Sequence, residues 1–248
     1  MIQPFPLSSA VLALGLGLSS AAFAAPAPER PRADAPPPVE LRYAIQAREK
    51  GVHLKGNARI RWQAANGRYS MTNETRAMLL GTILEEKSEG AIDAYGLAPS
   101  SFMQQRYRKP ATRTSFDRAA GVIRFSGSAS THPIHGGEQD RGSAIWQLMA
   151  IARAAPARFK PDSNWTFHVA GPRDVDPWTF RVVAREKIRT PQGELAAVHI
   201  QRLTAPDSRD QQIDIWLAPA LEWLPVRLRY TEKNGDNIEQ TLESMSRK

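Results

Sequence analysis

Two histidines and two carboxylates lie close together in the middle of the chain, in the segment THPIHGGEQD. These residues are His132, His135, Glu138 and Asp140. Imidazole nitrogens and carboxylate oxygens bind zinc and other transition metals, so one interpretation is a hydrolytic or structural metal site. A proline lies between the two histidines, and their spacing differs from the helical spacing of zinc motifs. The pattern therefore favours the alternative, a polar loop before a helix, and predicts no metal and no cofactor.

A hydrolytic triad of Ser143, His135 and Asp140 is a second interpretation of the same region. Such triads are recognised by geometry rather than by nearness in sequence, and the residues around Ser143, RGSAI, lack the Gly-x-Ser-x-Gly elbow. Asp140 or Ser143 instead fits the role of a helix cap, which accepts a hydrogen bond from an otherwise unpaired backbone N–H. Arg141 suits the anchoring of a carboxylate, either within the protein or on a ligand. We predict no catalytic residues and keep His135, Asp140 and Arg141 as binding candidates.

Four arginines alternate with apolar residues in two predicted β-strands: Arg59, Arg61, Arg227 and Arg229. Alternation places them on the face opposite the core, where they form a basic patch if the two strands are neighbours. The chain has 33 Lys and Arg against 25 Asp and Glu, a formal net charge of +8. Phospholipid head groups and other anionic envelope components are therefore candidate partners. The alternative is a basic face that only keeps the protein soluble. Nucleic acid is not expected, because no interleaved aromatic stacking motif is present.

The N-terminal residues have the pattern of a secretory signal peptide. The apolar run from Val11 to Leu18 is followed by small residues and by Ala22-Phe23-Ala24, which predicts cleavage after Ala24. No Lys or Arg precedes the run, which departs from the usual pattern. The run is short for a membrane anchor and ends without a basic stop-transfer cluster. We therefore expect a mature protein in the periplasm that does not span the membrane after cleavage.

The composition of the 248 residues, 42% hydrophobic and 23% charged, is that of a globular protein with a sizeable core. The chain contains no cysteine, which excludes disulfides, thiol nucleophiles and thiolate zinc sites. After the predicted signal peptide over residues 1–24, residues 25–38 are rich in Pro and Ala, which predicts a solvated, extended linker. No linker-like stretch interrupts the rest, so residues 39–248 are predicted to form a single β-rich domain.

Period-two alternation of apolar and polar residues dominates this domain and indicates about a dozen strands. Asn66-Gly67 and Asn234-Gly235 predict tight hairpin turns. Residues 143–155 place apolar side chains at helical spacing and end at a proline, whereas residues 126–142 are predicted to be an irregular loop. The pattern predicts a mainly β fold, in the form of a strongly curved antiparallel sheet or half-open β-barrel with one helix packed on or in it.

Several short signatures occur in a distinctive order along the chain. They are Ser88-Glu89-Gly90, Gly96-Leu97-Ala98-Pro99, Phe116-Asp117, Gln139-Asp140-Arg141, Thr190-Pro191-Gln192-Gly193, Trp216-Leu217-Ala218-Pro219 and Leu224-Pro225-Val226-Arg227. Together they resemble the domain-of-unknown-function family 3108, a group of exported bacterial proteins, over residues 43–242. The resemblance implies an exported, β-rich protein and supplies no catalytic residues. It also implies a fold similar to the half-barrel of lipoprotein carriers, in which a curved sheet wraps a helix and shelters an acyl chain. Fold alone does not settle function.

These observations give three hypotheses from different classes. The first is a periplasmic, non-enzymatic binding or carrier protein that holds an apolar or amphiphilic envelope ligand in an enclosed cavity. The second is an envelope scaffold with a packed core, whose basic surface binds anionic envelope components in a salt-sensitive way. The third is a hydrolase, which requires His135, Glu138 or Asp140 to converge in a cleft, and the sequence favours it least.

Overall fold

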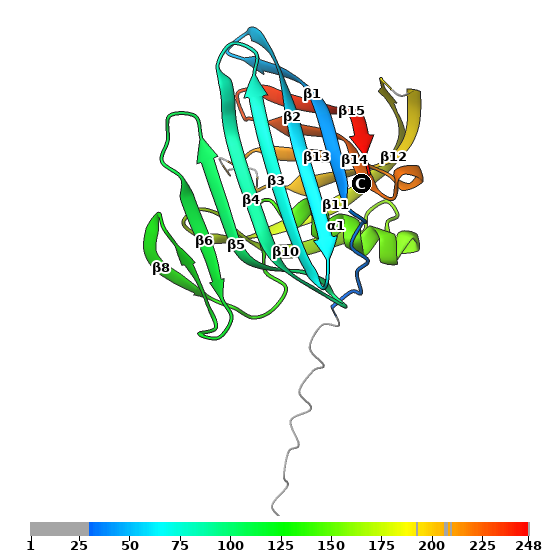
Figure 1. Ribbon diagram of the computed structural model, residues 1–248. Coiled ribbons are helices and arrows are strands. Elements are labelled where there is room, and N and C mark those ends of the chain that lie inside the picture. Colours follow the sequence, from blue (N-terminus) through cyan, green and yellow to red (C-terminus); the bar gives the residue numbers. More distant parts are fainter. Residues whose placement is uncertain (1–29, 192, 206–207, 209, 248) are drawn as a thin grey trace, which may run out of the picture.

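β-Strands account for most of the described chain in the computed structural model (Figure 1). The structure describes residues 30–191, 193–205, 208 and 210–247, so the predicted signal peptide lies outside the described residues. No helix in these ranges is both long and apolar enough to cross a membrane. The strands are β1 (Val39–Glu49), β2 (Val52–Ala65), β3 (Arg68–Ala77), β4 (Gly81–Asp93), β5 (Gly96–Arg106), β6 (Thr112–Asp117), β7 (Val122–Phe125), β8 (Ser128–Pro133), β9 (Gln139–Asp140), β10 (Asn164–Ala170), β11 (Val175–Thr190), β12 (Gly193–Leu203), β13 (Gln212–Ala218), β14 (Leu224–Thr231) and β15 (Asn237–Ser246). The helices are α1 (Ala144–Ala154) and two short 3-10 helices, η1 (Pro156–Arg158) and η2 (Pro219–Leu221).

All fifteen strands pair into one sheet in the order β8-β7-β6-β5-β4-β3-β2-β1-β15-β14-β13-β12-β11-β10-β9. The pairs are antiparallel, apart from the parallel pair of β9 and β10. Strand β1 pairs with β15, so the first and last strands of the described chain are neighbours near the middle of the sheet. This pairing joins the hairpins of the two halves of the chain and leaves β8 and β9 as the edges.

The two edges of the curved sheet approach each other without a backbone ladder. The Thr114 hydroxyl on β6 donates a hydrogen bond of 2.8 Å to the carbonyl of Gly171, which follows β10. Phe125 on β7 packs with Ala170 in a small second hydrophobic cluster. The predicted mainly β fold, a curved sheet around one α-helix, is therefore confirmed. Side-chain contacts, rather than strand pairing, bring its edges together.

Helix α1 fills one end of the half-barrel, which we call the plugged end (Figure 1). Eight of its residues are buried, because its apolar stripe packs on the concave face of the sheet. The indole of Trp146 stacks on that of Trp62 from β2, with ring centroids 4.4 Å apart. Trp62 in turn stacks on Tyr69 from β3 at 5.3 Å. The helix predicted over 143–155 is thus confirmed to within one residue at each end.

The turn between β4 and β5 is fixed against α1 by a side-chain amide. The Gln147 carbonyl accepts a hydrogen bond of 2.7 Å from the backbone N–H of Leu97, and its amide nitrogen donates one of 2.8 Å to the carbonyl of Tyr95. Gly96, with φ of 107°, makes this approach possible, since a β-carbon at this position would collide with the amide of Gln147.

Residues 30–38 also lie against the plugged end. The Asp34 backbone N–H donates a hydrogen bond of 2.8 Å to the carbonyl of Ala150 in α1. The Trp62 indole N–H donates one of 2.8 Å to the carbonyl of Pro36, which is buried. The expectation of a solvated linker is therefore wrong for this segment. A proline-rich chain has few N–H groups, yet its carbonyls remain available as acceptors for donors of the domain.

The segment 126–142 is more regular than the sequence predicts, because it contains the short strands β8 and β9. Gln139 and Asp140 of β9 pair in parallel with the end of β10. This pairing depends on residues about thirty positions away, so local turn residues in the segment do not reveal it. With these strands the sheet has fifteen members rather than about a dozen.

The opposite end of the half-barrel, the open end, is formed by connections between strands. The Lys50 backbone N–H in the β1–β2 turn donates a hydrogen bond of 2.9 Å to the Asp236 carboxylate in the β14–β15 turn. The Met78 N–H in the β3–β4 turn donates one of 3.0 Å to the carbonyl of Lys55. The β5–β6 connection is held to β4 by a backbone hydrogen bond of 2.8 Å from Tyr107. Four connections therefore lie side by side at this end.

Candidate functional site

The residues considered for a metal site or a triad do not converge. The Glu138 carboxylate accepts hydrogen bonds from the backbone N–H groups of His135 and Gly136. The Ser143 hydroxyl accepts one of 2.9 Å from the backbone N–H of Asp140. In the described ranges the His135 ring bonds to neither of these side chains, and no group of three or more His, Cys, Asp or Glu could hold a metal ion. The region is thus organised by side-chain contacts to its own backbone.

Asp140 connects the start of α1 to the sheet. Its Oδ1 accepts hydrogen bonds of 2.8 Å from the backbone N–H groups of both Gly142 and Ser143, and its Oδ2 accepts one of 2.6 Å from the Ser88 hydroxyl on β4. The hydroxyl of Tyr69 lies 3.0 Å from the same Ser88 oxygen. Burial raises the pKa of Asp140 to about 7, although the hydrogen bonds oppose the shift. This binding candidate therefore directs its hydrogen bonds to the protein itself.

Arg141 lines a cavity of about 50 Å³ between the start of α1 and the concave face of the sheet. The wall combines apolar side chains, such as Met71 and Leu228, with polar ones, such as Asn73 and Glu86. Among the described residues the Arg141 guanidinium has no hydrogen bond and no ion pair. Partial burial, and then the nearby charge of Arg106, lower the pKa of Arg141. A guanidinium remains charged in proteins. The Arg141 nitrogens lie against Gly171, and the carboxylates of Asp174 and Asp210 favour this charge from beyond ion-pair distance.

Other polar atoms near the cavity also lack partners. Asn73 Oδ1 and the Thr75 hydroxyl, both on β3, are buried without a hydrogen bond. The Glu86 carboxylate, in contrast, accepts hydrogen bonds of 3.0 Å from Asn73 and 2.7 Å from Gln104. Burial and the charge of Glu86 raise the pKa of Tyr230, which lines the same cavity. Because buried polar groups normally have partners, this wall is suited to a polar or hydrated guest.

The cavity is too small for an acyl chain. One water molecule needs about 10–15 Å³ of such volume, so 50 Å³ accommodates only a few waters or one small chemical group. The enclosed apolar cavity expected for a carrier is therefore not found between α1 and the sheet. The apolar inner face continues toward the open end, however, where Ala47 on β1 pairs with both Leu54 on β2 and Ile238 on β15.

Arg59 and Arg61 surround a carboxylate on the convex face. Their Nε atoms lie 2.9 Å and 3.0 Å from the Glu40 oxygens, and Arg42 lies 3.0 Å from the same carboxylate. Burial acts to raise the pKa of Glu40, but hydrogen bonds from Arg59 and Arg61 outweigh it and bring the pKa down to about 2. Three guanidinium groups share one carboxylate, so this cluster keeps a positive charge.

Arg227 and Arg229 form a separate cluster on β14. Strands β1 and β15 lie between β2 and β14, so the four arginines do not make the single basic patch that neighbouring strands would give. The Arg229 Nε donates a hydrogen bond of 2.9 Å to Glu239 on β15, and the Arg227 Nε lies 3.4 Å from the same carboxylate. The alternation of apolar and charged residues places both arginines on this face, and their ion pairs with Glu239 neutralise part of their positive charge.

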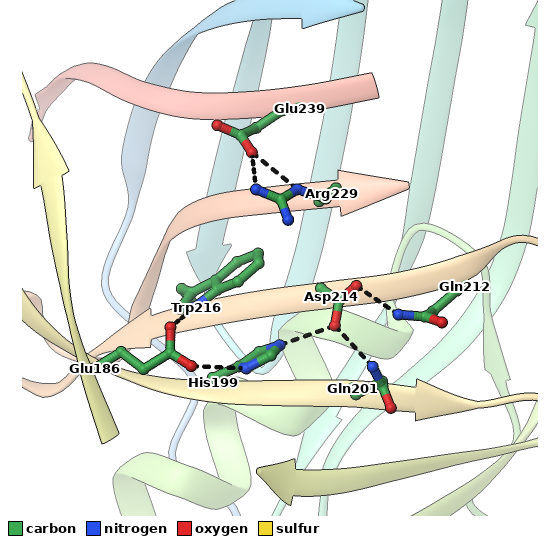
Figure 2. A network of polar contacts seen from close by, with 8 residues as sticks. All are labelled: Glu186, His199, Gln201, Gln212, Asp214, Trp216, Arg229 and Glu239. Atoms are coloured by element: carbon green, nitrogen blue, oxygen red, sulfur yellow. Dashed lines mark hydrogen bonds and ion pairs between the residues drawn. The ribbon is translucent and has the colours of Figure 1, made fainter. Parts of the chain in front are cut away.

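Beside this cluster, Figure 2 shows a polar network across β11, β12 and β13 that the sequence does not reveal. His199 stacks on Trp216, with ring centroids 4.4 Å apart. The Nδ1 and Nε2 atoms of His199 lie 3.1 Å from Glu186 and 2.8 Å from Asp214. The Trp216 indole N–H donates a hydrogen bond of 3.0 Å to Glu186. The polar positions of three adjacent strands meet here, and only the strand register brings them together.

Two carboxylates beside one imidazole favour its charged form. Burial lowers the pKa of His199, but Asp214 and Glu186 outweigh this effect and the net shift is upward. Burial likewise acts to raise the pKa of Asp214, but His199 and two glutamine side chains bring it down. Each charged group in this network has a hydrogen-bonded or ion-paired partner, whereas the Arg141 side chain has neither kind of bond among the described residues, so we take the Arg141 cavity as the candidate site.

The family model described as "Protein of unknown function (DUF3108)" matches residues 41–243. The chain belongs to this family. A β-barrel-like protein of the domain of unknown function DUF1849 from Brucella abortus has a TM-score of 0.58 at 12% identity, covering 88% of this chain and 99% of that chain. This similarity extends the fold, and the fold alone, to a second family. A putative outer membrane lipoprotein-sorting protein domain from Vibrio parahaemolyticus has a TM-score of 0.33 at 10% identity, with 85% of each chain covered. No curated protein matches the sequence.

Proposed function

We propose that this DUF3108 protein is a non-enzymatic binding protein of the cell envelope, and that it holds the anionic group of a small amphiphile beside Arg141. The observation that carries the proposal is the partly buried Arg141, which lines the cavity and whose side chain has no hydrogen bond or ion pair among the described residues. A charge in this position loses hydration, and Asp174 and Asp210 compensate it only from beyond ion-pair distance. An anionic group, such as a phosphate or carboxylate, would supply charge-assisted hydrogen bonds to the guanidinium fork.

The apolar part of such a ligand would lie outside the small cavity. Ala47, Leu54 and Ile238 form a paired apolar strip on the inner face between the cavity and the open end. A short alkyl chain on this strip would bury apolar surface at about 25 cal/mol per Å². The carrier hypothesis is thereby narrowed from an enclosed acyl chain to an amphiphile bound at the open end.

Two further features support the proposal. The Ser143 and Asp140 side chains each accept a hydrogen bond from the other residue's backbone N–H, and among the described residues neither bonds to the His135 ring, which speaks for a binding role rather than hydrolysis. The signal peptide predicted over residues 1–24 and the family resemblance support an envelope location, and the periplasm is the compartment that we propose. The proposal requires no metal and no cofactor.

A titration with dodecyl phosphate, below its micelle concentration, tests the proposal. We expect the folded wild-type protein to bind it and to bind the uncharged dodecyl maltoside more weakly. The Arg141→Gln substitution should weaken dodecyl phosphate binding by about 10- to 100-fold, the range expected for hydrogen bonds to a charged group. The matched control is Arg185→Gln on β11, an exposed arginine, which should leave the affinity unchanged. Equal affinity of the Arg141→Gln protein, or no binding by the wild type, contradicts the proposal.

The scaffold hypothesis is the second candidate, because α1 fills much of the interior and three arginines surround the single carboxylate of Glu40. It predicts salt-sensitive binding of anionic envelope polymers such as lipopolysaccharide. Such binding would be weakened by the double substitution Arg59→Gln and Arg61→Gln and unaffected by Arg141→Gln. That result, without dodecyl phosphate binding, would replace the first proposal with the second.

A further inference from the structure

The β3–β4 turn exposes three large apolar side chains in succession. Met78, Leu79 and Leu80 have exposed fractions of 74%, 86% and 55%. The turn is held in place by backbone hydrogen bonds, from Met78 to the carbonyl of Lys55 and from Leu80 to the carbonyl of Ala77. We call residues 78–80 the apolar tip. Its side chains add little to folding in this position, and exposed apolar groups gathered at one place commonly mark an interaction site.

Basic residues surround the apolar tip. They lie on the ends of three adjacent hairpins, within residues 48–55, 76–83 and 106–112, and we call them the basic collar: Arg48, Lys50, Lys55, Arg76, Arg106, Arg108 and Lys109. Glu49 is the single acidic residue in these ranges, so seven basic residues against one acidic residue leave a formal charge of +6. Arg76 has an ion pair with Glu74 at 3.0 Å. Among the described residues Lys50, Lys55 and Lys109 have no ion pair.

We infer that the apolar tip and the basic collar dock the open end onto an anionic membrane surface. Apolar side chains enter the boundary between head groups and acyl chains, while Lys and Arg around them attract anionic lipids. Each basic residue close to such a surface adds to the attraction, and three neighbouring hairpins present them together. The observations behind this inference are the exposures and charges of the hairpin ends, so it does not rest on the proposed function.

The charge also argues against a second copy of the chain as the occupant. In a two-fold dimer the same surface faces itself, so two collars of +6 would oppose each other. An anionic bilayer, in contrast, complements both the charge and the apolar side chains. Docking in this way would turn the open end, with its apolar strip and the Arg141 cavity, toward the membrane.

Vesicle flotation with the full mature chain tests this inference. The two probes are vesicles of phosphatidylcholine alone and vesicles of phosphatidylcholine mixed with phosphatidylglycerol. We expect wild-type protein to bind the mixed vesicles in a salt-sensitive way. Replacing all three tip residues, Met78→Ser, Leu79→Ser and Leu80→Ser, should weaken this binding by at least about tenfold. The double substitution Lys55→Glu and Lys109→Glu should weaken binding to the mixed vesicles more in low salt than in high salt.

Two exposed residues away from the tip provide matched controls. Val183 on β11 and Tyr95 at the plugged end are both 41% exposed, and Val183→Ser and Tyr95→Ser should bind vesicles like the wild type. Absence of wild-type binding to mixed vesicles, or unchanged binding by the triple variant, overturns the inference. So does a wild-type dimer in sedimentation velocity that the triple variant loses without any vesicle binding. Dodecyl phosphate affinity should stay unchanged in the triple variant, which separates failure of this inference from failure of the proposed function.

Discussion

The plugged and open ends are extensions of the same strands, yet their side chains are arranged in opposite ways. At the plugged end the indoles of Trp62 and Trp146 stack, and the polar atoms of Gln147 bond to the backbone. At the open end the apolar tip is exposed to solvent, and the basic collar surrounds it. Stacked, buried side chains at one end and exposed apolar side chains at the other indicate that stability and binding are located in different parts of the barrel.

The difference between the two ends is compatible with ligand binding by a barrel that α1 mostly fills. Helix α1 fills one end of the barrel, so the space left for a ligand lies between the start of α1 and the open end. The fold needs its plugged end in order to be stable, since apolar burial is the main favourable contribution to folding. The open end can then keep charges and apolar side chains that do not stabilise the fold.

The largest expected effect comes from emptying the plugged end. The Trp146→Ala substitution should lower the free energy of unfolding by about 3–5 kcal/mol, because it removes a buried aromatic side chain and its stacking partner loses contact. Urea denaturation followed by circular dichroism measures the change. A loss below 1 kcal/mol would mean that α1 is not the main stabilising element and that the plugged end is not the source of the stability of the fold.

A second effect concerns Asp140, which joins α1 to the sheet. Its pKa of about 7 lies above the usual value, so the folded state binds more protons than the unfolded state between pH 4 and 7. Stability from this group is therefore highest at low pH and falls as the pH rises through this window, by up to about 1.4 kcal/mol per pH unit. Asp140→Asn retains an oxygen for both backbone N–H groups and removes the ionisation. The free energy of unfolding of the Asp140→Asn protein should rise relative to that of wild type as the pH rises. Urea denaturation at several pH values measures both free energies. A difference between the two proteins that does not change with pH would contradict this expectation.

A third, smaller effect is expected at the network on the convex face. The pKa of His199 is raised, so its stabilisation is fully present below the unfolded pKa, near 6.5, and is lost as the pH rises through the folded value. His199→Gln should lower the free energy of unfolding by about 1 kcal/mol at pH 6. The difference from wild type should shrink toward alkaline pH. A difference independent of pH would show that stacking on Trp216, rather than charge, is the source of the stabilisation.

The smallest effect is expected at the open end. Leu79→Ser changes a side chain that is 86% exposed, so the free energy of unfolding should stay within about 0.5 kcal/mol of wild type. Thermal unfolding monitored by tryptophan fluorescence is sufficient to detect a larger change. A loss similar to that of Trp146→Ala would mean that the apolar tip packs in the native protein, and the contrast between the ends would not hold.

The parts of the fold that could be predicted depend on local patterns. Alternation in β2 and the turn at Asn66-Gly67 identify a hairpin, and apolar spacing over 143–155 identifies α1, because these signals lie within one element. The closing strands could not be predicted in the same way. Strand β9 forms by pairing with β10, and residues 30–38 are held by a donor on β2 and a carbonyl acceptor on α1.

In the candidate site, too, local patterns predict some features, whereas others depend on strand register. Arg141 is a binding candidate from the sequence because its guanidinium suits the anchoring of a carboxylate, but its cavity depends on β3, β4, β14 and β15. The outward direction of Arg59 and Arg229 follows from alternation, whereas their pairing with Glu40 and Glu239 depends on register. His199 and Asp214 lie fifteen positions apart, and no spacing rule for strands connects them before the register of β12 and β13 is known.

Native mass spectrometry of the mature protein, purified from its own cell envelope, tests the central claim most directly. We expect a discrete extra mass that solvent extraction releases as a small anionic amphiphile. We also expect this mass to be absent from protein carrying Arg141→Gln and present in protein carrying Arg185→Gln. A bare polypeptide mass for the wild type, with no uptake of added dodecyl phosphate, would contradict the account and leave an envelope scaffold with a packed core.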